Sequence, residues 1–492
     1  MQLVDIKKFF DKERLRTIMT SLSRVQVNQK AYRCWYKLNQ TTVFSVATPA
    51  GVTDSAEAQD LVPQGSGGAA RASGLDIGLG LESQFLGSTD EVSFGSVKCN
   101  PQAFQDDIAR LAECVNSTNT GNIKISQMLE LKGLECHPTK TTFITIGTKK
   151  YKNKVEKELK RNPIIFGSFQ CKPKEQDLYL GDMISSNGLE ASVEATIAHR
   201  QGKIRGEMFE MKAIMEDFRL QVVGGMAGAI DVWEMGICAK LLANCGSWVG
   251  CGKPSFRQLN QLQDSYLRMV YSCPPSTPIP ALRALAGVWD METKVALEKV
   301  CLVTTILHDR DETNYARELL EEEMFQGWQG ITQEVQDICR VMGLQDATKV
   351  RLSRKEVKDT MSLHSLSIIK KEMEGKTKCD QIYNRDFRKI QDFMKQKSLE
   401  NARMEFLWLT NMIDTRTTMK AKYNKKYNCP HCREGIEEGT LESPLHLIDC
   451  QAYSDLRQGI NPEQNYEDRA VYLRKVITRR KALEGKLRTD SD

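Results

Sequence analysis

The residues that most directly suggest chemistry are two adjacent carboxylates, Asp106 and Asp107. This is the single Asp-Asp pair in the 492-residue chain. They lie between apolar residues at a point where a hairpin would turn. Adjacent carboxylates repel each other, so a buried or half-buried pair needs cations nearby. Phosphoryl transfer by two divalent metal ions requires a carboxylate cluster of this kind. An exposed turn with two solvated acids is the alternative for a bare pair.

A second group of chemically competent side chains lies near the C-terminus, at Cys429, Cys432, His446 and Cys450. The spacing C-x₂-C-x₁₃-H-x₃-C suits a tetrahedral zinc site with three thiolates and one imidazole. His431, adjacent to Cys432, is expected to point away from the ion. Four unrelated residues in a cysteine-rich chain are the alternative. Basic residues flank the group, which fits a modest nucleic-acid contact as well as an ordinary solvated helix.

Short apolar segments are expected to position the acids. Leu3 and Val4 have the pattern of the end of a buried strand, with Asp5 at its exit. Alternation of apolar and polar residues predicts a single strand over 92–97. Further strands or hairpins are predicted at 103–108, 141–146 and 178–184.

Helical periodicity predicts helices on both sides of residue 189. Before it they are expected at 12–23, 28–38, 123–134 and 149–161. After it the pattern changes to long helices at 190–218, 256–273 and 280–308, with a proline-rich break at 273–278, and continues helical over 312–343 and 349–378. The segment 149–161 holds seven basic and two acidic residues. It is either a solvated helix face or a contact for a phosphate backbone.

The composition is that of a folded chain, with 40% hydrophobic and 27% charged residues, long enough for about three domains. This balance excludes disorder throughout. Fifteen cysteines without a secretory signal favour reduced thiols, some of them metal ligands. No apolar run approaches the roughly 20 residues of a membrane helix, and no signal peptide is apparent. We therefore expect an intracellular protein, cytoplasmic or nuclear, without a membrane partner. The net charge of +5 does not by itself imply nucleic acid.

Five short motifs resemble, in the same order, those of reverse transcriptases, and together they cover about residues 1–190. Leu3 to Asp11 resembles the first palm motif, an Asp followed by an aromatic residue and a further Asp. Phe104-Gln105-Asp106-Asp107 resembles the aromatic-x-Asp-Asp hairpin. The others are Pro63-Gln64-Gly65, resembling the Pro-Gln-Gly motif, Gly133-Leu134 with Lys140-Thr141, resembling the Gly-Leu…Lys-Thr motif, and Tyr179-Leu180-Gly181 with Ile184, resembling the primer grip. With a cysteine–histidine knuckle downstream, the chain resembles the non-LTR (LINE-like) retrotransposon reverse transcriptases.

The resemblance implies a role for each matching residue. Asp5, Asp106 and Asp107 would bind the catalytic Mg²⁺ or Mn²⁺ ions. Phe10 would exclude the 2′ hydroxyl of a ribonucleotide. The remaining roles concern substrates: Gln64 and Gly65 would line the incoming dNTP, Lys140 would protonate the departing pyrophosphate, and Tyr179 to Ile184 would position the primer end. The implied partners are an RNA template, a DNA primer and dNTPs.

Two features depart from the family pattern. Gln105 stands where family members often have Ala, which is tolerable because this side chain need not touch metal. The chain also begins at the first metal-binding motif, so we expect truncation at the N-terminal side, with the fingers largely missing and efficient extension impaired. The endonuclease domain of such elements would lie upstream or on another chain.

The resulting expectation is an α+β fold in four parts: a right-hand polymerase palm over 1–189, a helical thumb over 190–310, a helical connector over 311–415, and a zinc knuckle with C-terminal helices over 416–492. The expected function is RNA-directed DNA polymerase. The alternative is a catalytically inactive, truncated relic that only binds RNA or DNA. A group-II-intron or telomerase-type relative is a weaker third possibility, because neither explains the knuckle.

Overall fold

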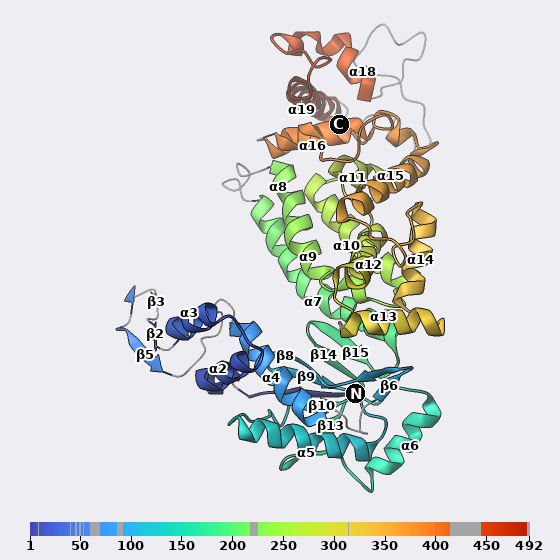
Figure 1. The fold of residues 1–492 in the computed structure, drawn as a ribbon. Coiled ribbons are helices and arrows are strands. Elements are labelled where there is room, and N and C mark those ends of the chain that lie inside the picture. Colours follow the sequence, from blue (N-terminus) through green and yellow to red (C-terminus); the bar gives the residue numbers. More distant parts are fainter. Residues whose placement is uncertain are drawn as a thin grey trace. The chain divides into compact units, whose positions relative to one another are not determined.

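The structure, a computed structural model, describes residues 1–7, 9–39, 41–44, 47–48, 51–52, 54–59, 69–85, 92–216, 225–312, 314–396, 398–413 and 444–489 (Figure 1). It divides into two compact units, one formed by 1–196 with 310–329 and the other by 197–309 with 330–492. Among the residues that the structure describes, no helix combines the length and apolar character that spanning a membrane requires.

A five-stranded mixed sheet is the centre of the first unit. Its strand order is β13-β10-β1-β9-β8, so the N-terminal strand β1 (Gln2–Asp5) is in the middle. β1 pairs antiparallel with β9 (Asp107–Arg110) on one side and with β10 (Thr142–Phe143) on the other. β8 (Gln102–Phe104) pairs antiparallel with β9, and β13 (Lys172–Pro173) pairs parallel with β10. A strand of four residues is therefore held from both sides.

Alternation along β1 and β9 separates a buried face from a polar one. Val4 lies opposite Ile108, and both belong to the apolar core of the unit. Helices α4 (Ala69–Phe85), α5 (Val115–Leu131) and α6 (Lys149–Leu159) add Ile77, Leu81, Phe85, Ile125, Met128, Leu129 and Val155 to this core. Figure 1 shows α5 and α6 lying along one side of the sheet. Since successive strand residues point to opposite faces, Asp5 and Asp107 are directed away from this core.

A buried polar cluster joins α2 (Leu15–Arg24), α4 and the end of α5. Ser73 Oγ donates to the Glu13 carboxylate, and Ser21 Oγ donates to Asp76 Oδ1 at 2.5 Å. Lys132 Nζ lies 2.6 Å from Asp76 Oδ2. The pKa of Glu13 is raised from 4.5 to about 7, chiefly by burial and in part by the neighbouring Asp76 charge, against the opposing effects of the Ser73 hydrogen bond and Lys132. Glu13 is thus a buried carboxyl group that gives up its proton only near neutral pH.

The remaining elements of the first unit are short. They are α1 (Phe9–Lys12), α3 (Gln29–Asn39), β2 (Thr41–Phe44), β3 (Ala47–Thr48), β4 (Gly51–Val52), β5 (Ala56–Gln59), β6 (Val92–Phe94), β7 (Val97–Cys99), β11 (Ile165–Phe166), β12 (Phe169–Gln170), β14 (Gln176–Tyr179), β15 (Asp182–Ser185) and α13 (Tyr315–Gln326). The loop between β6 and β7 contacts α13, where Ser96 Oγ donates to Glu322 at 2.7 Å.

Helices form the second unit. They comprise most of α7 (Leu189–Glu216), then α8 (Gly225–Asp231), a π-helical segment (Val232–Ile237), α9 (Cys238–Leu241), α10 (Lys253–Tyr271), α11 (Ile279–Ala286), α12 (Met291–Asp309), α14 (Ile331–Met342), α15 (Arg354–Met373), α16 (Leu399–Leu409), α18 (Pro444–Asp449) and α19 (Tyr466–Thr489). Short 3₁₀ segments lie at Cys245–Ser247, Thr377–Cys379, Asp392–Lys395 and Gln451–Arg457.

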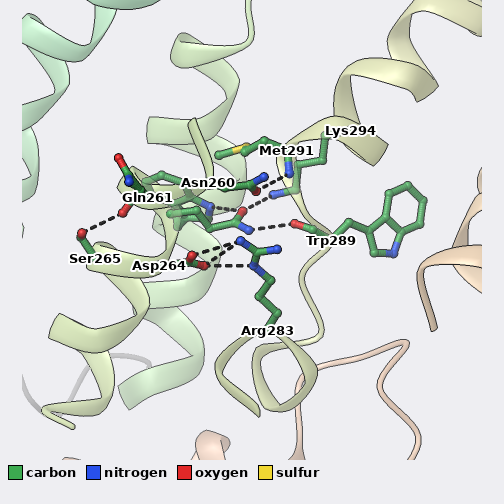
Figure 2. A network of polar contacts seen from close by, with 10 residues as sticks. Asn260, Gln261, Asp264, Ser265, Arg283, Trp289, Met291 and Lys294 are labelled. Atoms are coloured by element: carbon green, nitrogen blue, oxygen red, sulfur yellow. Dashed lines mark hydrogen bonds and ion pairs between the residues drawn. The ribbon is translucent and has the colours of Figure 1, made fainter. Parts of the chain in front are cut away.

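Polar side chains of α10 tie the next two helices to it. Asp264 accepts from Arg283 Nε and Nη2 at 3.0 and 3.1 Å, and the Asp264 side chain is buried while that of Arg283 is largely buried (Figure 2). Asn260 Oδ1 accepts from the backbone N–H of Met291, at the first residue of α12. Because buried polar groups must find partners, these bonds fix where α11 and α12 begin and end relative to α10.

The predicted α+β class is confirmed, with helices predominating over a small mixed sheet. The buried strand before Asp5 and the hairpins at 103–108 and 178–184 are confirmed as well. The single strand predicted over 92–97 is wrong. Gly95 adopts φ 58°, so the segment turns and forms the hairpin β6–β7.

The single helix predicted over 280–308 is also wrong. It is interrupted at Gly287, which has φ 66° and ends α11 before α12 begins at Met291. The apolar periodicity continues across the break, because both helices bury a face in the same core. The helix predicted from 123 begins already at Val115, because the thiol of Cys114 caps it by accepting from Ser117 N–H at 3.4 Å.

Two glycines that end helices provide a matched test of this packing. A Cβ on Gly287 would lie 2.5 Å from the carbonyl carbon of Lys389, whereas a Cβ on Gly343 (φ 72°) would meet nothing within 4 Å. Gly343→Ala should therefore lower the free energy of unfolding by about 1–2 kcal/mol, the cost of the left-handed conformation alone. Gly287→Ala should cost a further ~1–3 kcal/mol from overpacking. Urea denaturation of both variants measures the difference, and equal losses would contradict the contact between Gly287 and Lys389.

Candidate functional site

The carboxylates of Asp5 and Asp107 are brought together by the register of β1 and β9. The two residues are directly opposite each other in the ladder, although they are about a hundred positions apart in the chain. The backbone N–H of Ile6 donates to the Asp106 carbonyl oxygen at 2.9 Å, which extends the pairing into the turn. The strand that ends at Asp5 thus pairs with the hairpin that holds Asp106 and Asp107.

The turn before Asp107 consists of Gln105 and Asp106. Phe104 pairs with Asp107 across it, and Gln105 has φ 57°, an uncommon conformation for a residue with a side chain. Phe104 is 57% exposed, so this aromatic ring is not part of the core. The tight turn projects both acids from the end of the hairpin.

A loop between α5 and β10 adds a cation. The carbonyl oxygen of Asp5 accepts from His137 N–H at 2.8 Å, and Thr141 N–H donates to His137 O at 2.9 Å. These bonds position Lys140, whose Nζ lies 3.2 Å from Asp5 Oδ2. The Lys140 side chain is 62% exposed, so the ion pair is accessible to solvent and contributes little to stability.

The hairpin β14–β15 completes the site. Tyr179 pairs with Asp182, and the two turn residues Leu180 and Gly181 both have positive φ, 49° and 84°. Such a turn matches the twist of the strands it joins and is one of the favoured two-residue hairpin connections. It brings the turn of the hairpin to the same cavity as the acids.

These segments line one cavity of about 380 Å³. Asp5 and Asp107 come from the sheet, Lys140 from the loop before β10, and Tyr179 to Gly181 from the last hairpin. Asp106 is at the turn and does not line the cavity wall. Four of the five sequence motifs therefore contribute residues to one cavity, and the fifth, at Gln64 and Gly65, lies outside the described residues.

The electrostatics of the cavity favour a bound cation. Burial raises the pKa of Asp107, and the charges of Asp106 and Asp5 raise it further, opposed by the Lys140 ammonium. Burial and the Asp107 charge also raise the pKa of Tyr179. Lys140 therefore offsets only part of the charge of Asp5, Asp106 and Asp107, because the second lysine of the cavity, Lys174, is paired with Asp177.

The donor set consists of carboxylate oxygens, the ligands that Mg²⁺ and Mn²⁺ prefer. The Lys140 ammonium on Asp5 already shows that a cation is accommodated there. Within the described part of the chain, however, no three Asp, Glu, His or Cys side chains converge as closely as a metal site requires. The residues fit the ions in chemistry and backbone placement, and their side chains would have to rotate toward a common point.

Several predicted site residues are not described. Cys429 and Cys432, like Gln64 and Gly65, lie outside the described residues. Phe10 is in α1, and its side chain is not described. The other half of the predicted zinc group is described: the backbone N–H of Cys450 donates to His446 O at 2.8 Å, so the two residues are one helical turn apart. This spacing can present two ligands on one face.

The structure adds residues to the cavity that sequence reasoning missed, chiefly Asp177, Lys174 and Thr139. Asp177 accepts from Lys174 Nζ at 2.8 Å and from the Thr142 hydroxyl. Asp177 is two residues before Tyr179 on the same strand, so strand alternation places both on one face. The alternation along this strand could therefore have predicted that Asp177 lies at the site, beside Tyr179.

Comparison with known proteins adds no assignment: no protein-family model matches the chain, and a search of curated proteins finds no match.

The opposed carboxylates predict that Asp107→Asn stabilises the first unit in the absence of divalent ions. A carboxyl group with a raised pKa holds its proton more tightly in the folded state, so its contribution to stability falls as pH rises from its unfolded pKa through the raised value. At pH 7 the substitution should raise the free energy of unfolding by about 0.2–1 kcal/mol, the range for charges directly opposite in a sheet. It should also flatten the pH dependence between these two pKa values.

The measurement is chemical denaturation at several pH values in EDTA. Asp177→Asn is the matched control from the same cavity. Because Asp177 has a cationic partner, this variant should lose stability instead. A destabilised Asp107→Asn would show that the carboxylates do not repel each other.

Proposed function

We propose that the chain is a reverse transcriptase of the non-LTR retrotransposon type, an RNA-directed DNA polymerase that extends a DNA primer on an RNA template. The observation that carries the proposal is the register that sets Asp5 opposite Asp107 beside Lys140 and the turn at Leu180-Gly181. These residues come from four separate segments, and each matches a different motif. In this proposal the sheet and its hairpins form the palm, the helices of 190–310 the thumb and those of 311–415 the connector.

The carboxylates of Asp5, Asp106 and Asp107 would hold the Mg²⁺ or Mn²⁺ ions. Such ions, when bound, acidify the primer 3′ hydroxyl and offset the charge on the leaving pyrophosphate. Asp107 is suited to this task because its pKa is raised first by burial and then by the charges of Asp106 and Asp5, and a bound cation would offset both effects. The backbone of its partner Asp5 is held on one side by the pairing with Asp107 and on the other by the His137 N–H, so the distance between the two backbones is set before substrate arrives.

The remaining residues orient substrate and move protons. Lys140 Nζ is exposed and able to leave Asp5, so it can donate a proton to an oxygen of the departing pyrophosphate. The backbone of the tight turn at Leu180-Gly181 would contact the primer and position its 3′ end. Phe10 would contact the sugar, and Gln64 and Gly65 the incoming dNTP.

A second candidate function is nucleic-acid binding without catalysis. The observation that favours it is the pairing of Lys140 with Asp5, together with the lack of three converging ligands among the described residues. Under this alternative the carboxylates are structural relics, and the chain retains RNA or DNA without extending it.

Primer extension on an RNA template distinguishes the two. With Mg²⁺ and dNTPs, the chain should extend a DNA primer, and Asp107→Asn should lower the rate by about 10²–10⁴-fold, since several kcal/mol of transition-state stabilisation are lost. Asp177→Asn, in the same cavity, should reduce the rate far less.

Unchanged extension by a variant with both Asp106→Asn and Asp107→Asn would overturn the polymerase assignment. Tight binding of primer–template with no extension by the unaltered chain would favour the second candidate.

We also propose that Cys429, Cys432, His446 and Cys450 hold a structural Zn²⁺. The support is the spacing and the single helical turn between the last two. Purified protein should contain about one zinc ion per chain, and Cys429→Ser should lose it, because the thiolate is a ligand. The matched control is Cys34→Ser, which removes an exposed thiol elsewhere. Elemental analysis decides the point, and zinc retained by Cys429→Ser would refute the assignment.

A further inference from the structure

A row of cations runs along one side of α6. Lys150, Lys154 and Lys157 are three or four residues apart, and Arg161 follows four residues later, just past the end of the helix. At 100° per residue these positions share one face. All four residues are exposed. We call them the α6 stripe.

The opposite side of α6 is anchored in the core, which fixes the direction of the stripe. Val155 is 7% exposed and packs in the same core as Val4 and Ile108, with Tyr151 and Leu159 beside it. The hydroxyl of Tyr151 donates to the Glu113 carbonyl oxygen at 2.5 Å. Rotation of the helix would bury cations, so the stripe cannot turn inward.

Both ends of the helix are held as well. Thr148 Oγ1 accepts from Tyr151 N–H at the first turn. Lys152, which is not in the stripe, donates to Asn187 Oδ1 at 3.1 Å. Beyond the last turn, Asn119 Nδ2 donates to Asn162 Oδ1 and to Pro163 O, at 3.3 and 3.0 Å. These hydrogen bonds hold α6 in place, so the four cations of the stripe keep a fixed position on the first unit.

The helix has two acids, Glu156 and Glu158. Glu158 lies next to the stripe, four residues after Lys154, but none of the ion pairs found among the described residues joins it to a stripe side chain. Glu156 pairs with Lys160 at 3.7 Å, on a different side of α6. In the described portion of the chain, no ion pair involves a side chain of the stripe. A cationic face that costs self-repulsion and gains no internal partner is suited to an external anion.

We propose that the α6 stripe binds the phosphodiester backbone of a nucleic acid. From Lys150 to Lys157 the helix rises about 10 Å, about three times the ~3.4 Å by which successive phosphates of one strand advance along the axis of a B-form duplex. A lipid surface would instead need an available apolar face beside the cations, and the apolar face of α6 is already buried.

The stripe is separate from the carboxylate cavity, because none of its residues lines that cavity. It adds a second contact for nucleic acid to the function proposed above, and binding there needs neither nucleotide nor divalent metal. A failure of polymerase activity is therefore distinguishable from a failure of this inference.

The test uses the full chain and a short labelled RNA–DNA hybrid, in EDTA and without dNTPs. A variant with Lys150→Gln and Lys154→Gln loses two stripe charges. The control with Lys149→Gln and Lys160→Gln loses two exposed charges from the same helix, about a quarter turn away. Binding is measured as a function of salt concentration.

The stripe variant should bind more weakly, and the slope of log Kobs against log salt should become shallower by about two, one for each lost phosphate contact. The control should leave the slope unchanged. Replacing Lys150 and Lys154 with Arg should retain binding, which separates lost charge from altered folding. Equal slope changes in both glutamine variants would overturn the inference, as would binding to anionic vesicles that depends on the stripe while hybrid binding does not.

Discussion

The antiparallel register of β1 and β9 is the constraint on which the first unit depends. In this register Val4 and Ile108 face the core, while Asp5 and Asp107 face the cavity. A slip of one residue would exchange the two faces, expose the apolar pair and bury carboxylates. Hydrophobic burial beneath the sheet therefore selects the arrangement of the acids above it. The positions of the acids are thus specified in part by Val4 and Ile108, two residues that belong to the apolar core.

The placement of Asp5 opposite Asp107 lowers the stability of the sheet but provides the carboxylates that the proposed function requires. Like charges directly opposite each other destabilise a sheet. The pKa of Asp107 is raised by burial and, in addition, by the charges of Asp106 and Asp5. The sheet tolerates this unfavourable interaction because β1 is paired with strands on both sides and its apolar residues are deeply buried. Lys140 offsets part of the charge but remains exposed and exchangeable. A stronger, buried lysine would give a more stable sheet and a site closed to other cations.

Local patterns predicted much of this architecture, and long-range pairing could not be predicted from them. Alternation and turn residues gave the strand before Asp5 and the hairpin at Asp106-Asp107, since both are decided within a few residues. The break at Gly287 was missed because apolar periodicity runs through it. The pairing of Lys140 with Asp5 joins residues 135 positions apart, and only the sheet order reveals it. The resemblance placed them in one site without indicating that they pair. The roles of Gln64, Gly65, Cys429 and Cys432 stay predictions, because these residues lie outside those described.

The buried carboxyl group of Glu13 affects how readily α2 and α4 separate. We call the polar contact between these helices, formed by Glu13 with Ser73 and by Ser21 with Asp76, the seam. In the closed seam its pKa is about 7, whereas a solvated carboxyl group titrates near 4.5. Separation of the two helices between these pH values therefore releases a proton. Acidification within this interval holds the seam shut, and a rise toward neutrality loosens it. Local opening between α2 and α4 is thus coupled to protonation of Glu13, so the opening contribution to amide exchange in these helices should vary with pH.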